Sequence, residues 1–187
     1  RAAEALAAFD EVLARDDNLA VAWYQSHGPA LDLLGQDAAR RRIERALACP
    51  GANGNYPALL AAYLLLAGQP EAAKRVARKA RHRVLIDGIG ALAPYFSGNF
   101  RLFGMASTLL DHALDQARLA GLVLEFGVRR GTSLRQIARK AGQTVHGFDS
   151  FEGLPESWGN NPAGLLSTGA LLPQVPSNAR LHPGWFE

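Results

Sequence analysis

Two acidic residues and two hydroxyls stand beside glycines in the second half of the sequence. Residues 123–133 read VLEFGVRRGTS, so Glu125 lies inside an apolar run that glycine interrupts. The strand is expected to end in a glycine turn, and a helix is expected to begin at Thr132 and Ser133. Free N–H groups at the start of a helix favour an anion. Asp149 ends the next apolar run, about where a carboxylate meets ribose hydroxyls in nucleotide-binding units. Together these residues indicate a ligand with ribose and charged groups.

The spacing of the glycines argues against two common nucleotide loops. A phosphate loop has four residues between its glycines and a lysine before the hydroxyl, whereas three residues lie between Gly127 and Gly131 and no lysine follows. The dinucleotide fingerprint has a glycine where this chain has Arg129. A ligand with adenosine, carboxylate and ammonium groups remains, with Glu125 facing the ammonium, and S-adenosylmethionine is such a molecule. Each residue also has a structural interpretation, as a tight turn, a helix N-cap or a loop cap.

The apolar runs around these residues predict an α/β unit. LVLEFGV at 122–128 has the composition of a parallel strand buried on both faces, and TVHGFDS at 144–150 predicts a second strand. Between them, SLRQIARKAG at 133–142 has helical spacing and predicts a helix. We expect a right-handed crossover between these strands. ARLHPGWFE at 179–187 predicts a third strand, and 103–121 predicts a helix that precedes the unit.

The first half of the chain predicts an all-α repeat. Shifting the sequence by 34 residues superposes small residues: Ala5, Ala39 and Ala73. A period of this size is typical of helix-turn-helix repeats. Glycines in 33–39 and in 66–73 are expected to end one helix and begin the next, and Pro29 is expected to break or kink its helix.

Two segments near the middle of the chain have distinctive composition. KRVARKARHR at 74–83 predicts one amphipathic helix with a solvated basic face, because too little further basic or aromatic sequence supports a nucleic-acid partner. IDGIGALAPYFSGNF at 86–100 is rich in glycine, proline and aromatic residues, and predicts an irregular connector.

Composition indicates a non-membrane protein in a reducing compartment. No apolar run approaches the roughly 18 residues that span a bilayer. The single cysteine, Cys49, cannot form an internal disulfide, so we expect a cytoplasmic setting. The sequence begins at Arg1 and its one methionine is Met105, so we expect the natural start to be missing.

Part of the first half resembles the tetratricopeptide repeat family. AWY at 22–24, LG at 34–35 and the small residues above carry this resemblance, although the loop at 49–57 is longer than the family's usual turn. The resemblance implies about two repeats over 1–85. Such repeats bind proteins, self-associate or act as spacers.

The second half resembles the macrocin O-methyltransferase family of class I S-adenosylmethionine-dependent methyltransferases. The resemblance is carried by EFGVRRGTS at 125–133, by HGFDSFEGLPE at 146–156 and by HPGWFE at 182–187. It implies a Rossmann-like methyltransferase domain over 103–187, following a connector at 86–102. With Glu125, the residues expected at the cofactor are those of the methionine-side loop, the ribose acid and the adenosine border: Gly127, Val128, Gly131, Thr132, Ser133, Asp149, Ser150, Phe151 and Glu152.

The chain departs from that family at its end. A complete domain continues through four more strands, whereas this chain stops at Glu187, so the resemblance implies a truncated sheet that is inactive alone. It also implies O-methylation of a sugar or natural-product hydroxyl, and a divalent metal such as Mg²⁺ held by residues outside this chain. No catalytic base is assigned. A non-catalytic repeat scaffold fused to a degenerate cofactor fold is the alternative, and nucleic-acid modification is a third interpretation.

Overall fold

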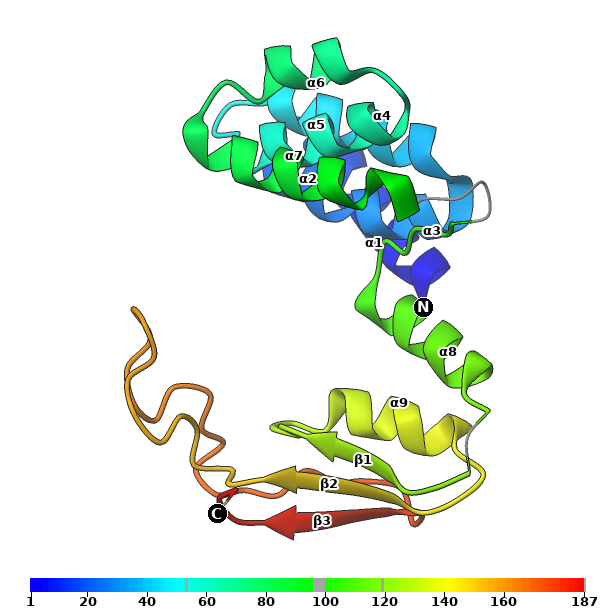
Figure 1. The fold of residues 1–187 in the computed structure, drawn as a ribbon, viewed down its shortest axis with the longest axis vertical. Helices are drawn as coiled ribbons and strands as arrows, with labels where there is room; N and C mark the ends of the chain where they lie inside the picture. The colour runs from blue at the N-terminus through cyan, green and yellow to red at the C-terminus, as the bar shows by residue number, and fades with distance from the viewer. Residues whose placement is uncertain (53, 96–99, 119, 187) are drawn as a thin grey trace. The chain divides into compact units, whose positions relative to one another are not determined.

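The computed structural model describes residues 1–52, 54–95, 100–118 and 120–186, drawn in Figure 1. The chain divides into two compact units, Arg1–Ala106 and Ser107–Glu187. The first unit is helical, and the second contains a parallel sheet. The α/β class is therefore confirmed. In the described part of the chain, no helix has the length and apolar character to cross a membrane.

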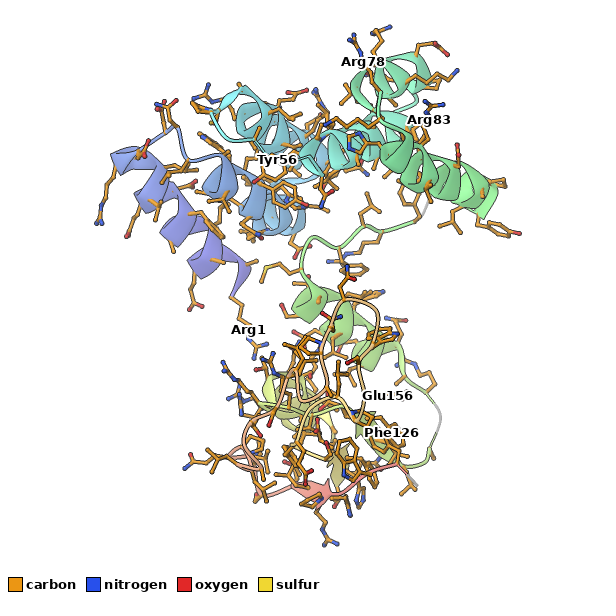
Figure 2. All side chains as sticks on the ribbon, turned by 90° about the vertical axis from the view of Figure 1, so that its left-hand side faces the viewer. Arg1, Tyr56, Arg78, Arg83, Phe126 and Glu156 are labelled. Carbon is orange, nitrogen blue, oxygen red and sulfur yellow. The ribbon has the colours of Figure 1, made fainter. Side chains whose placement is uncertain are left out.

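The first unit is a succession of helices joined by short turns. These are α1 Ala2–Arg15, α2 Ala20–Gln25, α3 His27–Leu34, α4 Gln36–Ala48, α5 Tyr56–Leu66, α6 Pro70–Val76 and α7 Ala80–Leu92, followed by a 3-10 turn at Ala93–Tyr95. The predicted turn glycines are confirmed, because Gly35 has φ 86° after α3 and Gly68 has φ 71° after α5. Helix α5 is apolar on nearly all sides, and both α6 and α7 pack against it. Tyr56, the first residue of α5 and labelled in Figure 2, packs instead against residues of α2 and α4.

The predicted break near Pro29 is also confirmed. Pro29 has no N–H to donate to the carbonyl of Gln25, and the helix is interrupted at Ser26 between α2 and α3. The buried Ser26 hydroxyl accepts a hydrogen bond from Arg42 Nη1 at 2.8 Å. Arg42 Nη2 in turn donates to Asp10 Oδ1 at 2.6 Å. This chain of polar contacts ties α1, the break and α4 together.

A backbone contact fixes the last residues of the first unit on α3. Gly28 lies so close to Gly104 that a Cβ built on Gly28 would be 2.5 Å from the Gly104 carbonyl oxygen. The amide of Gly104 donates to Asp32 Oδ1 at 2.7 Å. Glycine at both positions therefore permits an approach that side chains would prevent.

Three sequence predictions about helices are wrong. The basic stretch 74–83 is not one helix, because α6 ends at Val76 and the chain turns so that α7 can also pack on α5. The segment 86–100 is helical as far as Leu92, since packing of Ile86 on the core outweighs the helix-weakening glycines. The helix expected over 103–121 is shorter and runs from Ala106 to Gln116.

The second unit is a three-stranded parallel sheet with a helix on one face. Its elements are α8 Ala106–Gln116, β1 Val123–Phe126, α9 Thr132–Lys140, β2 Val145–Asp149 and β3 Ala179–Pro183. The strand order is β1-β2-β3, with Glu125 opposite Gly147 and Asp149 opposite Pro183. The three predicted strands and the helix after β1 are confirmed. The burial predicted for both faces of the first strand is wrong, because Leu124 and Phe126 are exposed on the face of the sheet away from α9. Figure 1 shows the three arrows pointing the same way with α9 beside β1.

The two faces of the sheet differ in cover. Val145 and Gly147 lie beneath α9, and a Cβ on Gly147 would be 2.7 Å from methyl groups of Leu134 and Val128. The other face carries aromatic side chains, including Phe126, which is 65% exposed and is labelled in Figure 2. Its ring stacks on Phe148 with 5.1 Å between centroids.

A long irregular segment, 150–178, joins β2 to β3. Within these described residues there is no helix or strand beyond an isolated bridge between Trp158 and Asn161, but backbone hydrogen bonds hold the segment together. Leu154 and residues 164–165 exchange two backbone hydrogen bonds, of 2.8 and 3.0 Å. The Asn178 amide donates to Ala138 O at 2.7 Å, which ties the end of the segment to α9. In Figure 1 this segment extends beyond the arrowhead end of the sheet.

Candidate functional site

A cavity of about 750 Å³ opens where the parallel strands end. All three strands contribute to its wall: Gly127 follows β1, Asp149 ends β2, and Trp185 follows β3. The irregular segment closes another side with Leu154 and Leu166. Clefts at the carboxyl ends of parallel strands are the usual place for ligands in α/β folds.

Asp149 connects the loop after β1 to this cavity. Its Oδ2 accepts the backbone N–H of Arg129 at 2.7 Å, and its Oδ1 accepts the N–H of Phe151 at 2.6 Å. An ionised carboxylate has about four lone-pair positions. Two of them remain for a ligand in the cavity, which matches the two hydroxyls of a ribose.

The loop between β1 and α9 alternates left-handed residues. Gly127 has φ 93°, Arg129 has φ 50° and Gly131, at the N-cap of α9, has φ 69°. Glycine adopts this conformation freely, but an L residue pays roughly 1–2 kcal/mol for it. Arg129 thus has a left-handed backbone that favours glycine, yet it is one of the residues that line the cavity.

Glu125 is an incompletely satisfied acid on β1. Its Oε2 is buried and has no hydrogen-bond partner among the described residues. Burial raises the pKa of the Glu125 carboxyl, the hydrogen bond with Ser133 lowers it, and the negative charge of Asp149 raises it again, with a net rise from 4.5. A cationic group of a ligand would supply both the missing donor and the missing positive charge.

We expect Glu125→Gln to raise the thermal stability of the second unit at pH 7. The folded state holds the Glu125 proton more tightly than the unfolded state, so ionisation costs stability as the pH rises from 4.5 through the raised pKa. Gln cannot ionise and avoids this cost. The gain in Tm should be largest at pH 7 and shrink as the pH falls toward 4.5. Melting curves of both proteins across this range test it, and a variant with a lower Tm at pH 7 would contradict it.

The structure brings together some of the residues predicted at the cofactor. Gly127, Asp149 and Ser150 line the cavity. Glu125 and Ser133 are not among its lining residues, although the Glu125 carboxyl interacts with both Ser133 and Asp149. The others do not line it: Val128 and Phe151 have their side chains in the core, Gly131 and Thr132 begin α9, and Glu152 is exposed.

Sequence reasoning missed the aromatic wall of the cavity. Trp185 and Phe186 line it, with one residue between them and the end of β3, and Leu154, Pro155 and Leu166 complete its apolar side. An aromatic pair at the carboxyl end of a predicted parallel strand is a usable signal, because all such ends meet at one edge. The residues of the irregular segment had no periodicity that could place them.

Histidines and metal ligands do not gather at this cavity. His146 and His182 lie on the exposed sheet face, where their ring nitrogens are 2.9 Å apart. Within the described ranges, no group of three His, Cys, Asp or Glu side chains is placed to hold a metal ion.

Comparison of the chain with models of known protein families, with curated proteins and with solved structures found no match. The methyltransferase and tetratricopeptide resemblances therefore stay predictions that rest on the motifs quoted above.

Proposed function

We propose that the second unit binds S-adenosylmethionine and belongs to a methyltransferase that acts on a small-molecule hydroxyl. The observation that carries the proposal is the Asp149 carboxylate, which lines the cavity beside Gly127 and keeps acceptor capacity there. Its position at the end of β2 is the one from which acids contact ribose hydroxyls in Rossmann-like folds. We propose that fold for this unit, with the chain supplying its first part.

Each end of the cofactor has a suitable group in the chain. Asp149 would accept hydrogen bonds from the ribose, and the rings of Trp185 and Phe186 would contact the adenine face. The unpartnered Glu125 oxygen would accept a hydrogen bond from the ammonium group. The N-terminus of α9 at Thr132 would favour the carboxylate.

When bound, S-adenosylmethionine would supply the methyl group for the acceptor hydroxyl oxygen, and S-adenosylhomocysteine and a proton would be released. The chain's residues orient the ligand, and the apolar wall excludes water from it. The acceptor we propose is a sugar or natural-product hydroxyl. A Mg²⁺ ion that positions this hydroxyl would be held by residues outside the chain.

For the first unit we propose tetratricopeptide-like repeats that dock a protein partner or a second copy. The helices α3 to α6 alternate with glycine-marked turns and pack on their neighbours along the chain, as repeat units do. If the second unit binds no cofactor, this docking role becomes the main function, as in the scaffold alternative.

Calorimetric titration with S-adenosylmethionine and S-adenosylhomocysteine tests the proposed function. We expect Asp149→Asn to weaken both ligands about 10- to 100-fold, because one charge-assisted hydrogen bond is worth about 1.5–3 kcal/mol. Glu156→Gln is the matched control, since it makes the same chemical change outside the cavity.

Three results would contradict the proposal. Folded wild-type protein could fail to bind either ligand, Asp149→Asn could bind as the wild type does, or Glu156→Gln could lose as much affinity. Melting curves of each variant show whether a loss of binding reflects unfolding, since Asp149 also holds the amides of Arg129 and Phe151.

A further inference from the structure

A second cavity, of about 490 Å³, adjoins the loop between β1 and α9. Three arginines line it: Arg129, Arg130 and Arg135. Its other lining residues come from the irregular segment at 167–174 and are polar or aliphatic, with no acidic side chain among them. Arg129 lines both this cavity and the larger one. We call the second cavity the arginine cavity.

No carboxylate forms an ion pair with the arginine cavity in the described part of the chain, and Asp149 accepts the backbone N–H of Arg129, not its guanidinium. The ion pairs of the described residues involve other cations, and none joins a carboxylate to Arg129, Arg130 or Arg135. Three like charges that share a concave surface repel one another and raise the local concentration of anions. An anionic ligand would relieve this repulsion.

One of the arginines is already held in place. Arg135 Nη1 donates to the carbonyl oxygens of Arg130 at 2.9 Å and Gln174 at 3.1 Å. Its Nε and Nη2 donors have no partner among the described residues, so a planar fork remains available for an anion. The hydroxyls of Ser167 and Thr168 donate to backbone carbonyls. The guanidinium groups, together with the Gln174 side-chain amide, are therefore the side-chain donors that the cavity offers.

We infer that the arginine cavity binds a phosphate group carried by the methyl acceptor. Phosphate presents a double negative charge and several oxygens, which suits two or three guanidinium forks better than a single carboxylate does. The shared residue Arg129 places this group next to the cofactor cavity. The assignment to the acceptor rests on the proposed function, whereas anion binding itself does not.

Titration with inorganic pyrophosphate tests the anion site, and titration with S-adenosylmethionine in parallel tests the cofactor site. We expect Arg130→Ala to weaken pyrophosphate about 10-fold or more and to leave S-adenosylmethionine binding unchanged. Arg139→Ala is the control, because it removes the same charge from the last turn of α9, outside the cavity. Pyrophosphate binding should also weaken as salt rises.

Arg129→Gly provides a second variant whose fold is not at risk. Glycine accepts φ 50° without strain, so Tm should not fall while pyrophosphate binding weakens about 10-fold. A folded Arg129→Gly protein that binds pyrophosphate as the wild type does would overturn the inference.

The two titrations separate the possible failures. Absence of pyrophosphate binding by the wild type, or an equal loss in Arg139→Ala, overturns the anion site. If Arg130→Ala loses S-adenosylmethionine binding but keeps pyrophosphate binding, the arginines are assigned to the cofactor carboxylate. This result also overturns the anion site. Arginine-dependent pyrophosphate binding without any S-adenosylmethionine binding supports the anion site and overturns its assignment to a methyl acceptor.

Discussion

Gly104→Ala is expected to lower the free energy of unfolding of the first unit by about 3 kcal/mol or more. A Cβ on Gly104 would overlap the Gly28 carbonyl and lie 2.6 Å from the Gly28 Cα. The added Cβ is fixed to the Gly104 backbone and its neighbours are backbone atoms of Gly28, so no side-chain rotation can relieve the overlap. The added methyl must push the backbone around Gly104 away from α3 and break the hydrogen bond from the Gly104 amide to Asp32.

Chemical denaturation followed by circular dichroism at 222 nm measures this effect, because the first unit is helical. Gly90→Ala is the control: Gly90 lies within α7, and nothing is within 4 Å of its added Cβ. Alanine in a helix interior should raise stability there by about 0.5–1 kcal/mol. The same substitution is thus expected to act with opposite signs at two positions. Similar stabilities for Gly104→Ala and wild type would show that the backbone contact is not maintained.

Gly153→Ala is expected to release the irregular segment from the sheet of the second unit. Gly153 has φ 88°, and its added Cβ would lie 2.5 Å from the carbonyl oxygens of Gly164 and Leu165. The left-handed backbone and the overlap together should cost about 3–5 kcal/mol of local stability. Since Gly153 and Leu166 line the larger cavity, ligand binding there should also be lost.

Limited proteolysis with chymotrypsin reports this release. The ring of Phe151 is buried in the core of the second unit, so cleavage after it requires the segment to open. A local cost of about 3 kcal/mol should accelerate that cleavage about 100-fold, if reclosing outpaces the protease. Gly159→Ala is the control, because Gly159 also has a left-handed backbone but has open space around it. Equal cleavage rates after Phe151 in the two variants would contradict the prediction.

The parts of the fold that were predictable are those set by local sequence. The apolar runs at 123–126 and 145–149 and the helical spacing after Gly131 each identify an element without knowledge of its neighbours. Because parallel strands end at one edge, Asp149 and Gly127 could be placed at the same cavity in advance.

The parts that failed depend on distant partners. The split between α6 and α7 has no local marker such as glycine or proline, and arises because both helices pack on α5. The helix through Gly88 and Gly90 forms against local propensity, with Ile86 packed on the core. The arginine cavity depends on how the segment 150–178 folds back, which no periodic pattern encodes.

The left-handed backbone at Arg129 has a consequence for how this protein can evolve. Every arginine codon becomes a glycine codon by a single-nucleotide change, and glycine suits φ 50° better than arginine does. Mutation therefore offers a conformationally easier residue at this position repeatedly, and neutral drift would accept it. Persistence of arginine in descendant lineages would accordingly record selection on the guanidinium group itself.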